Sequence, residues 1–287
     1  MKILILGANG LLGTHLSKYL KKKHKVITCG RNKKVDIKLK KFDQKSISFL
    51  LNNTSPQIII NLIALTNVDE CEKKPSMAKK INKNIVKNIV FAIKKIRSMN
   101  KIFFIHLSTD QVYSGKGPHN ENMTNPINIY GKTKLEGEKV IDIANSCIIR
   151  TNFIGKSLTK DKKSLTDWIH SSLINKQKIN TYNNIKFSPL SINSLCKYIN
   201  LIIRKKVCGT FNIGSKKGIT KSKLANIFAE YLKLDTSSIK EINYTKKYSI
   251  AKRPLDMRLN SSFFEKKINI KTKNTLSEIK LIIKDYI

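Results

Sequence analysis

Residues 2–13 read KILILGANGLLG, an apolar run of five residues followed by glycines at positions 7, 10 and 13. The run Lys2–Leu6 predicts a buried strand, and the apolar spacing after it predicts a helix. In this strand–turn–helix setting, Gly7 permits a tight turn, Gly10 lets a pyrophosphate approach the backbone, and Gly13 lets helix and strand pack closely. The positive end of the helix would also attract that pyrophosphate. The stretch therefore predicts a dinucleotide site, whose expected contacts are Gly7, Asn9, Gly10, Leu11, Leu12 and Gly13.

The second predicted strand, residues 25–31, ends in a basic residue. Sites selective for NAD usually place Asp or Glu here, where the carboxylate binds the ribose hydroxyls. This chain has Arg31 instead, with Lys33 and Lys34 nearby, and these side chains suit the 2′-phosphate of NADP. A solvated basic turn is the alternative. We expect NADP(H) as the cofactor and keep NAD(H) as the alternative.

Short apolar runs alternate with amphipathic helical patterns through the first half of the chain, one of which predicts a long helix over residues 77–96. This alternation predicts a Rossmann-type doubly wound parallel sheet. Beyond Gly155 the rhythm changes to shorter elements, among them a helix over residues 220–232 with Thr220 as its expected cap, which predicts a smaller C-terminal α/β domain. We expect a dinucleotide-binding domain over residues 1–155. A substrate-binding lid should occupy mainly residues 156–287, part of which could return to the main sheet.

Three further residues are candidate cofactor contacts. Asn61 and Ala64 end the apolar run of residues 56–64, which would lie beneath the cofactor. Asp43 has two interpretations that the sequence leaves open. It could reach an adenine amino group, or it could cap the helix that begins near Ser46.

The chemistry-bearing block runs from Ser108 to Lys134. Ser108 and Thr109 follow the apolar run 101–107, so they should lie at the carboxyl end of a strand, where open α/β sheets bind ligands. Tyr130 and Lys134 are spaced i, i+4 in a helical pattern and should share one face. The lysine charge would lower the cost of forming phenolate, so that the phenol could transfer a proton near neutral pH. A hydroxyl at the strand end could hold a carbonyl oxygen beside it.

Composition excludes several classes of protein. The 287 residues, 40% of them hydrophobic, can bury a full core, and no apolar run is long enough to span a membrane. Five scattered cysteines lack metal spacing, so we expect reduced thiols, a cytoplasmic protein and no metal. The net charge of +37 could suggest nucleic-acid binding. Only six of the 56 basic residues are Arg, however, and the lysines are spread evenly, which favours compositional bias.

Several motifs together resemble the extended short-chain dehydrogenase/reductases, and more narrowly the dTDP-4-dehydrorhamnose reductase family of sugar-nucleotide reductases. The similarity spans essentially the whole chain. It rests on the glycine turn, Ser108-Thr109-Asp110 and Tyr130-x-x-x-Lys134. The narrower resemblance rests on residues 61–69, on the block 126–138, on Arg150-Thr151, and on Arg253-Pro254 followed by Arg258, of which the C-terminal match is looser.

The resemblance implies an NADPH-dependent reductase of a nucleotide-activated 4-keto-sugar that serves cell-surface polysaccharide synthesis. It implies that Tyr130 donates a proton to the sugar ketone, that Lys134 binds the nicotinamide ribose, and that Thr109 or Ser108 holds the ketone oxygen. The remaining expected substrate contacts are Gln111, Phe153, Arg253 and Arg258. The expected partner is a nucleotide-diphosphate sugar, with neither nucleic acid nor membrane insertion, and a homodimer is allowed. Salt bridges between domains are the alternative role for the two arginines.

The relatives of this family leave other activities open. Dehydratases of nucleotide sugars carry Asp-Glu after the threonine, whereas this chain has Asp110-Gln111, and Gln cannot act as a general base. An epimerase that retains NAD would use the same Tyr and Lys. Some relatives are non-catalytic regulatory subunits that keep the dinucleotide fold.

Overall fold

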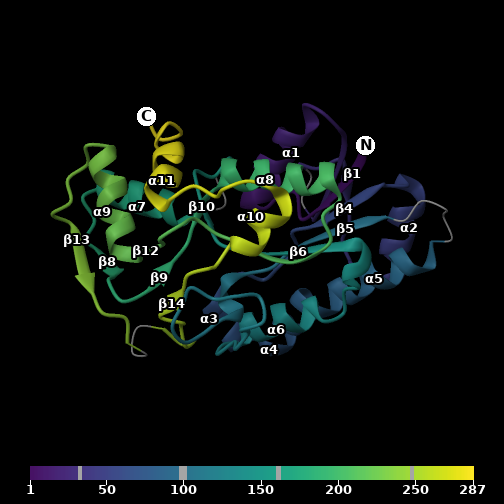
Figure 1. Cartoon of the computed structure of the whole chain (residues 1–287), viewed down its shortest axis with the longest axis horizontal. Helices are drawn as coiled ribbons and strands as arrows, with labels where there is room; N and C mark the ends of the chain where they lie inside the picture. Colours follow the sequence, from purple (N-terminus) through teal and green to yellow (C-terminus); the bar gives the residue numbers. More distant parts are fainter. Residues whose placement is uncertain (32–33, 97–101, 160–162, 246–248) are drawn as a thin grey trace.

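A computed structural model describes residues 1–31, 34–96, 102–159, 163–245 and 249–287. Its centre is a seven-stranded parallel sheet in the order β11-β6-β5-β4-β1-β2-β3 (Figure 1). The prediction of a Rossmann-type doubly wound sheet is confirmed. The strands are β1 (Lys2–Leu6), β2 (Lys25–Gly30), β3 (Ile37–Lys38), β4 (Ile58–Asn61), β5 (Phe103–Leu107), β6 (Ser146–Thr151) and β11 (Gly209–Ile213).

Helices cover both faces of the sheet because successive strand residues point to opposite sides. Ile3 and Ile5 of β1 pack under α1 and α8, whereas Leu4 and Leu6 pack toward α2 and α5. Figure 1 shows α1, α8 and α10 on one side and α3, α4, α5 and α6 on the other. The helices are α1 (Leu11–Lys21), α2 (Gln44–Thr54), α3 (Val68–Lys73), α4 (Pro75–Lys79), α5 (Ile85–Lys95), α6 (Ile129–Glu138), α8 (Ile192–Lys205) and α10 (Ser262–Ile268).

Side chains just before the helices cap them. Asp43 accepts a hydrogen bond from the Ser46 N–H at 2.8 Å and so caps α2. Asn128 accepts from the Gly131 N–H at 2.8 Å, which fixes the first turn of α6. Thr220 caps α9 (Lys221–Tyr231), as the sequence predicts. Each of these contacts satisfies an N–H that the helix itself leaves unpaired.

The predicted helix over residues 77–96 is interrupted by a π-helical turn, Lys80–Asn84. Asn82 in this turn is fully buried. Its Oδ1 accepts from the Leu65 N–H at 2.8 Å, and its Nδ2 donates to the Thr133 hydroxyl at 3.1 Å. The turn therefore joins the loop after β4 to helix α6.

A smaller part of the chain has its own core around Phe187, Phe228 and Ile279, and it lies beside the sheet at the left of Figure 1. Its strands are β7 (Phe153–Ile154), β8 (Ile179–Tyr182), β9 (Lys186–Phe187), β10 (Leu190–Ser191), β12 (Ile219–Thr220), β13 (Ile239–Ile242) and β14 (Asp256–Met257). Its helices are α7 (Leu165–Ile174), α9 and α11 (Thr275–Ile283).

The chain returns from this part to the main sheet. Strand β11 pairs with β6 in parallel, and α8 and α10 pack on the same face of the sheet as α1. The boundary near residue 155 stays a prediction, because the sheet uses residues on both sides of it. None of the helices in the described residues is long and apolar enough to cross a bilayer.

Candidate functional site

A cleft of about 720 Å³ lies at the carboxyl ends of the central strands, the edge at which open α/β sheets bind ligands. It gathers most of the residues that the sequence singles out: Gly7, Asn9, Gly10, Leu11, Leu12, Gly13, Arg31, Ala64, Ser108, Thr109, Gln111, Tyr130, Lys134 and Phe153. Others in its lining were not predicted as site residues: Gly30, Phe42, Leu62, Ile63, Thr66, Val68, Leu107, Asp110, Thr151, Asn152 and Lys163.

The glycine turn at one end of the cleft leaves no room for side chains. Gly7 has φ +82°, a conformation that other residues rarely adopt, and a Cβ on Gly13 would lie 2.6 Å from the carbonyl oxygen of Gly7. Helix α1 begins at Gly10 without a side-chain cap, which leaves its first N–H groups available to an anion. Asn9 Oδ1 is buried and has no hydrogen-bond partner among the described residues. These features fit a bound dinucleotide.

At the end of β2, Arg31 lines the cleft beside Gly30. The nearest acidic side chain in sequence, Asp36, accepts from the N–H and the hydroxyl of Thr28 at 2.9 and 2.8 Å. The Asp36 carboxylate is therefore bound to β2 and is not free to bind the ribose hydroxyls of a dinucleotide. Of the two lysines expected near the 2′-phosphate, Lys33 lies outside the described residues, and Lys34 is not part of the lining of the cleft.

The predicted catalytic residues come together where β5 ends and α6 begins. Tyr130 and Thr109 both line the cleft, and their hydroxyl groups share a hydrogen bond. Burial raises the pKa of Tyr130 above its ordinary value, which that hydrogen bond only partly opposes. The expected lowering of the phenol pKa by Lys134 is wrong for this structure. The lysine ammonium instead donates to the carbonyl oxygen of Leu107 at 2.6 Å.

Lys134 lies in a buried polar layer that the sequence analysis did not predict. Arg150 binds the carboxylate of Glu138 with Nη2–Oε2 at 2.6 Å, and the Ser108 hydroxyl donates to the same carboxylate. Burial lowers the pKa of Lys134 to about 8, although Glu138 favours the charged form. The Ser108 hydroxyl donates to Glu138 through a short hydrogen bond, whereas Thr109 donates to Asp110 over a longer 3.2 Å and also contacts the Tyr130 phenol. Thr109 is therefore the better placed of the two candidate hydroxyls.

Asp110 is another cleft residue whose role the sequence left unassigned beyond the contrast with dehydratases. It is 1% exposed and accepts from the Thr109 hydroxyl at 3.2 Å and from Asn152 Nδ2 at 3.0 Å. Burial raises the pKa of Asp110 to about 6, while the nearby Lys221 favours the charged form. The carboxyl thus orients Thr109 from behind, and only the fold brings Asn152 and Lys221 to it.

Four predicted site residues lie outside the lining of the cleft. Asp43 caps α2, which is one of its two predicted roles. Asn61 is fully buried beneath the cleft. Arg253 pairs with Asp69 at 2.7 Å, and Arg258 pairs with Asp256 at 2.6 Å and donates to the Gly117 carbonyl. The Arg253–Asp69 pair joins the two parts of the chain, as in the alternative that the sequence left open, whereas Arg258 pairs with a neighbour in its own segment.

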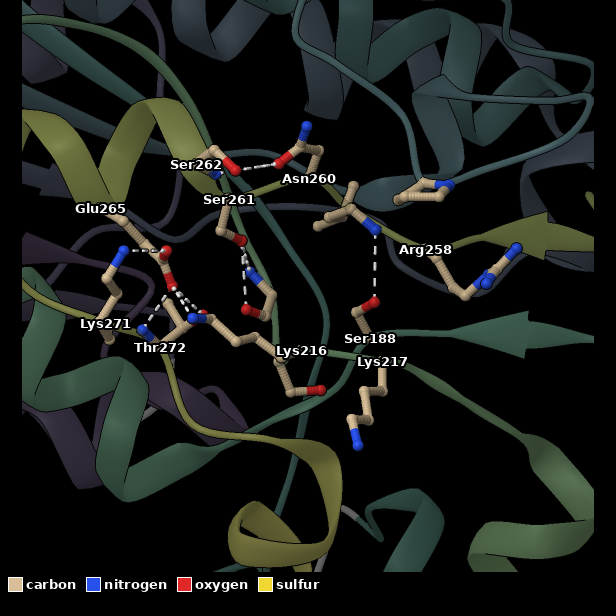
Figure 2. Close-up of a pocket in the computed structure, with 14 residues that line it drawn as sticks. Ser188, Lys216, Lys217, Arg258, Asn260, Ser261, Ser262, Glu265, Lys271 and Thr272 are labelled. Carbon is tan, nitrogen blue, oxygen red and sulfur yellow. Dashed lines mark hydrogen bonds and ion pairs between the residues drawn. The ribbon is translucent and has the colours of Figure 1, made fainter.

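Arg258 instead lines a second pocket of about 430 Å³, shown in Figure 2. Lys216, Lys217 and Lys271 surround it, and Glu265 lies 3.4 Å from the Lys216 ammonium. Among the described residues, this pocket and the cleft share no lining residue. In a chain with 50 lysines, three lysines around one pocket do not by themselves indicate a ligand.

Comparison with known proteins finds similarity along the whole chain. The family model described as "RmlD substrate binding domain" matches residues 1–287. The dTDP-4-dehydrorhamnose reductase of Salmonella typhimurium is 28% identical over 94% of this chain and 93% of its own. Methionine adenosyltransferase 2 subunit beta of Bos taurus is 25% identical, over 92% of this chain and 81% of its own.

A solved structure gives the same result. The dTDP-4-dehydrorhamnose reductase of Clostridium acetobutylicum superimposes with a TM-score of 0.87 at 26% identity, covering 100% of this chain and 99% of that protein. The similarity thus includes the smaller part of the chain, where the sequence motifs are looser.

Proposed function

The chain belongs to the RmlD substrate-binding-domain family, and we propose that it reduces the ketone of a nucleotide-activated 4-keto-sugar with NADPH. The resemblance to dTDP-4-dehydrorhamnose reductases that the motifs indicate is confirmed, and the chain is an NAD(P)-dependent oxidoreductase of the short-chain class. The sugar and the nucleotide base are not assigned.

One observation carries the proposal. The glycine turn after β1 and Arg31 after β2 line the same cleft as Thr109, Tyr130 and Lys134, and Thr109 follows β5, which β4 separates from β1. A dinucleotide whose pyrophosphate sits on the turn would extend its nicotinamide toward the phenol. The tight packing at Gly13 and the unpaired Asn9 Oδ1 support this placement.

Each residue has a separate role in holding the cofactor. The N–H groups at the start of α1 would bind the pyrophosphate, Arg31 the 2′-phosphate, and Lys134 the nicotinamide ribose. When bound, NADPH would supply the hydride that goes to carbon 4 of the sugar.

Tyr130 is the proposed proton donor. A phenol is protonated at neutral pH, and burial, which raises the pKa of Tyr130, keeps it so. It can therefore donate to the oxygen that becomes negative when the ketone is reduced. The Thr109 hydroxyl, which donates to Asp110 in this structure, would turn its single proton to the same oxygen when substrate binds, and Asn152 holds the Asp110 carboxyl behind it. Gln111 and Phe153 line the adjoining wall, where the sugar would lie. Roles for Arg253 and Arg258 in binding the diphosphate stay predictions.

A binding subunit without turnover is the second candidate, because relatives named as methionine adenosyltransferase beta subunits match over 92% of the chain. Such a protein would bind a dinucleotide in the same cleft. Intact Thr109, Tyr130 and Lys134 in that cleft favour the enzyme.

A panel of nucleotide 4-keto-sugars tests the proposal. The purified chain should oxidise NADPH with at least one member, and the product should be the 4-hydroxy sugar. Retention of tightly bound NAD through purification, with interconversion of 4-hydroxy epimers and no net NADPH oxidation, would point to an epimerase. Tight NADPH binding without turnover on any member would favour the binding subunit.

A further inference from the structure

Beneath the catalytic lysine lie two fully buried polar side chains, which form with it a hydrogen-bonded chain of three. Asn61 of β4 and His106 of β5 are register partners on adjacent strands, and Lys134 reaches them from α6. Asn61 and His106 are 0% exposed and Lys134 is 1% exposed. Water cannot readily satisfy these groups, so their hydrogen bonds must be consistent with one another.

The orientation of Asn61 is fixed by the backbone. The N–H of Ile63 donates to one end of the amide at 3.1 Å, and because an N–H can only donate, that end must be Oδ1. The other end, Nδ2, lies 3.1 Å from His106 Nδ1. An amide nitrogen can only donate, so His106 Nδ1 must accept.

This arrangement determines where His106 carries its proton. Burial, and then the charge of Lys134, hold the pKa of His106 well below its ordinary value, so the imidazole is neutral. A neutral imidazole has a single N–H. Because Nδ1 accepts from Asn61, the proton is on Nε2, which lies 3.3 Å from the Lys134 ammonium.

A donor on Nε2 conflicts with a charged lysine. An ammonium has three N–H groups and no lone pair, so it cannot accept the Nε2 proton, whereas a neutral amine can. The amine would still donate to the Leu107 carbonyl at 2.6 Å. The hydrogen bond from His106 of β5 therefore favours a neutral Lys134, whereas Glu138 of α6 favours a charged one.

The other charged and titratable groups near this layer do not remove the conflict. Arg150 of β6 already neutralises Glu138 through a paired contact at 2.6 Å. Tyr130 lies one turn earlier on the same helix and is protonated. Asp110, from the segment after β5, and Cys71, from α3, raise the pKa of that phenol further.

We propose that His106, held by Asn61 with its proton on Nε2, is a positioning residue that favours the neutral amine of Lys134 and so sets the alkaline limit of the reaction. The inference deepens the proposed function, because it concerns the lysine placed there on the nicotinamide ribose. Above that limit Lys134 loses the charge with which it binds and orients the cofactor.

The first test needs no turnover. In protein labelled with ¹⁵N-histidine, only five histidines give signals, and each can be assigned by removing it. His106 should stay neutral with the proton on Nε2 between about pH 5 and pH 9. A proton on Nδ1, or titration near the ordinary histidine pKa, would overturn the proposal.

The second test measures the lysine itself. His106→Phe removes the Nε2 donor, so the pKa of Lys134 should rise from about 8 by roughly one unit or more toward its ordinary value. In protein labelled with ¹³C-lysine, the pH dependence of the Lys134 Cε shift, assigned by its loss in Lys134→Met, reports this change without substrate and without a reagent that must reach the buried amine. The alkaline limb of the pH profile of kcat/KM should move up by the same amount. An unchanged lysine pKa in a folded His106→Phe protein would refute the role.

A matched control is His119→Phe. His119 is also buried, at 1% exposed, and bonds through Nε2 to the Asp256 carbonyl at 2.8 Å. Its loss should cost stability without moving the alkaline limb. Should the panel of keto-sugars give no turnover, the two NMR measurements still decide this inference separately from the proposed function.

Discussion

The two halves of the cleft are built differently. The dinucleotide half uses main chain at the ends of long parallel strands, with glycines where the backbone must be approached closely, as at Gly7 and Gly13. The substrate half uses side chains from separate segments held together by polar contacts. Gln111 there bonds to Met257 and Asn128, and Asn128 bonds in turn to the Lys252 carbonyl.

The difference shows how each half acquires its geometry. The glycine turn and Arg31 belong to one continuous segment, and the pairing of β1 with β2 fixes their positions relative to each other. Strands of only two residues, β9, β12 and β14, support the substrate half, so its geometry depends on contacts between distant segments. We expect changes in the first half to affect cofactor affinity, and changes in the second to affect substrate affinity.

The largest effect should come from Tyr130→Phe, where the two halves meet. Loss of the proton donor should lower kcat by about 10²–10⁴-fold. NADPH affinity should change by less than about threefold, because the dinucleotide half is untouched. Steady-state kinetics and a fluorescence titration with NADPH measure the two quantities. Equal losses in both would break the division between the halves.

The next largest effect concerns stability. Arg150→Met should destabilise the fold by about 3–5 kcal/mol, because Glu138 would remain buried and unpaired. The side chains of that pair are 7% and 4% exposed. Lys83→Met breaks the pair with Glu136, whose side chains are 29% and 42% exposed, and should cost less than about 1 kcal/mol. Urea unfolding measures the loss of unfolding free energy in both variants. Equal losses would show that the buried ion pair contributes no more to stability than the exposed one.

Arg31→Ala should change only cofactor choice. Loss of a charge-assisted hydrogen bond to the 2′-phosphate should weaken NADPH roughly tenfold, or about 1.4 kcal/mol, with little change for NADH. Titrations with both cofactors measure the ratio. If both weaken equally, Arg31 does not distinguish them.

The smallest effect should come from Asp69→Asn. Asp69 holds the Ala251 N–H at 2.9 Å and the Arg253 guanidinium at 2.7 Å, but the pair is partly exposed, so its loss should cost less than about 1 kcal/mol. Arg253→Ala is the matched change. A rise in the KM for substrate larger with Arg253→Ala than with Asp69→Asn would assign Arg253 to the diphosphate, whereas equal values would leave it a salt bridge only.

The sequence predicted those parts of the molecule whose cause is local. The strand Lys2–Leu6, the turn at Gly7 and the cap at Thr220 depend on a few neighbouring residues. The resemblance of residues 108–134 to known reductases also placed Thr109, Tyr130 and Lys134 in one site, as the cleft shows.

The parts that were missed depend on distant pairs. Nothing near Glu138 in the sequence indicates that Arg150 and Ser108 share its carboxylate. The direction of the Tyr130 pKa shift was wrong because burial of the phenol cannot be read from the i, i+4 spacing. In the sequence, His106 is one residue of the apolar run 101–107, and only the fold brings Asn61 and Lys134 within hydrogen-bond distance of it.

The return of β11 to the edge of the sheet has a consequence for biosynthesis. The ribosome releases β1 to β6 well before residues 209–213, so the emerging chain cannot complete its sheet for about 60 further residues of synthesis. Until then the edge of β6 is unpaired, and the apolar face that α8 will cover stays open to other nascent chains. A chaperone that shields this edge should therefore raise the yield of native protein more than one that acts only on the finished chain.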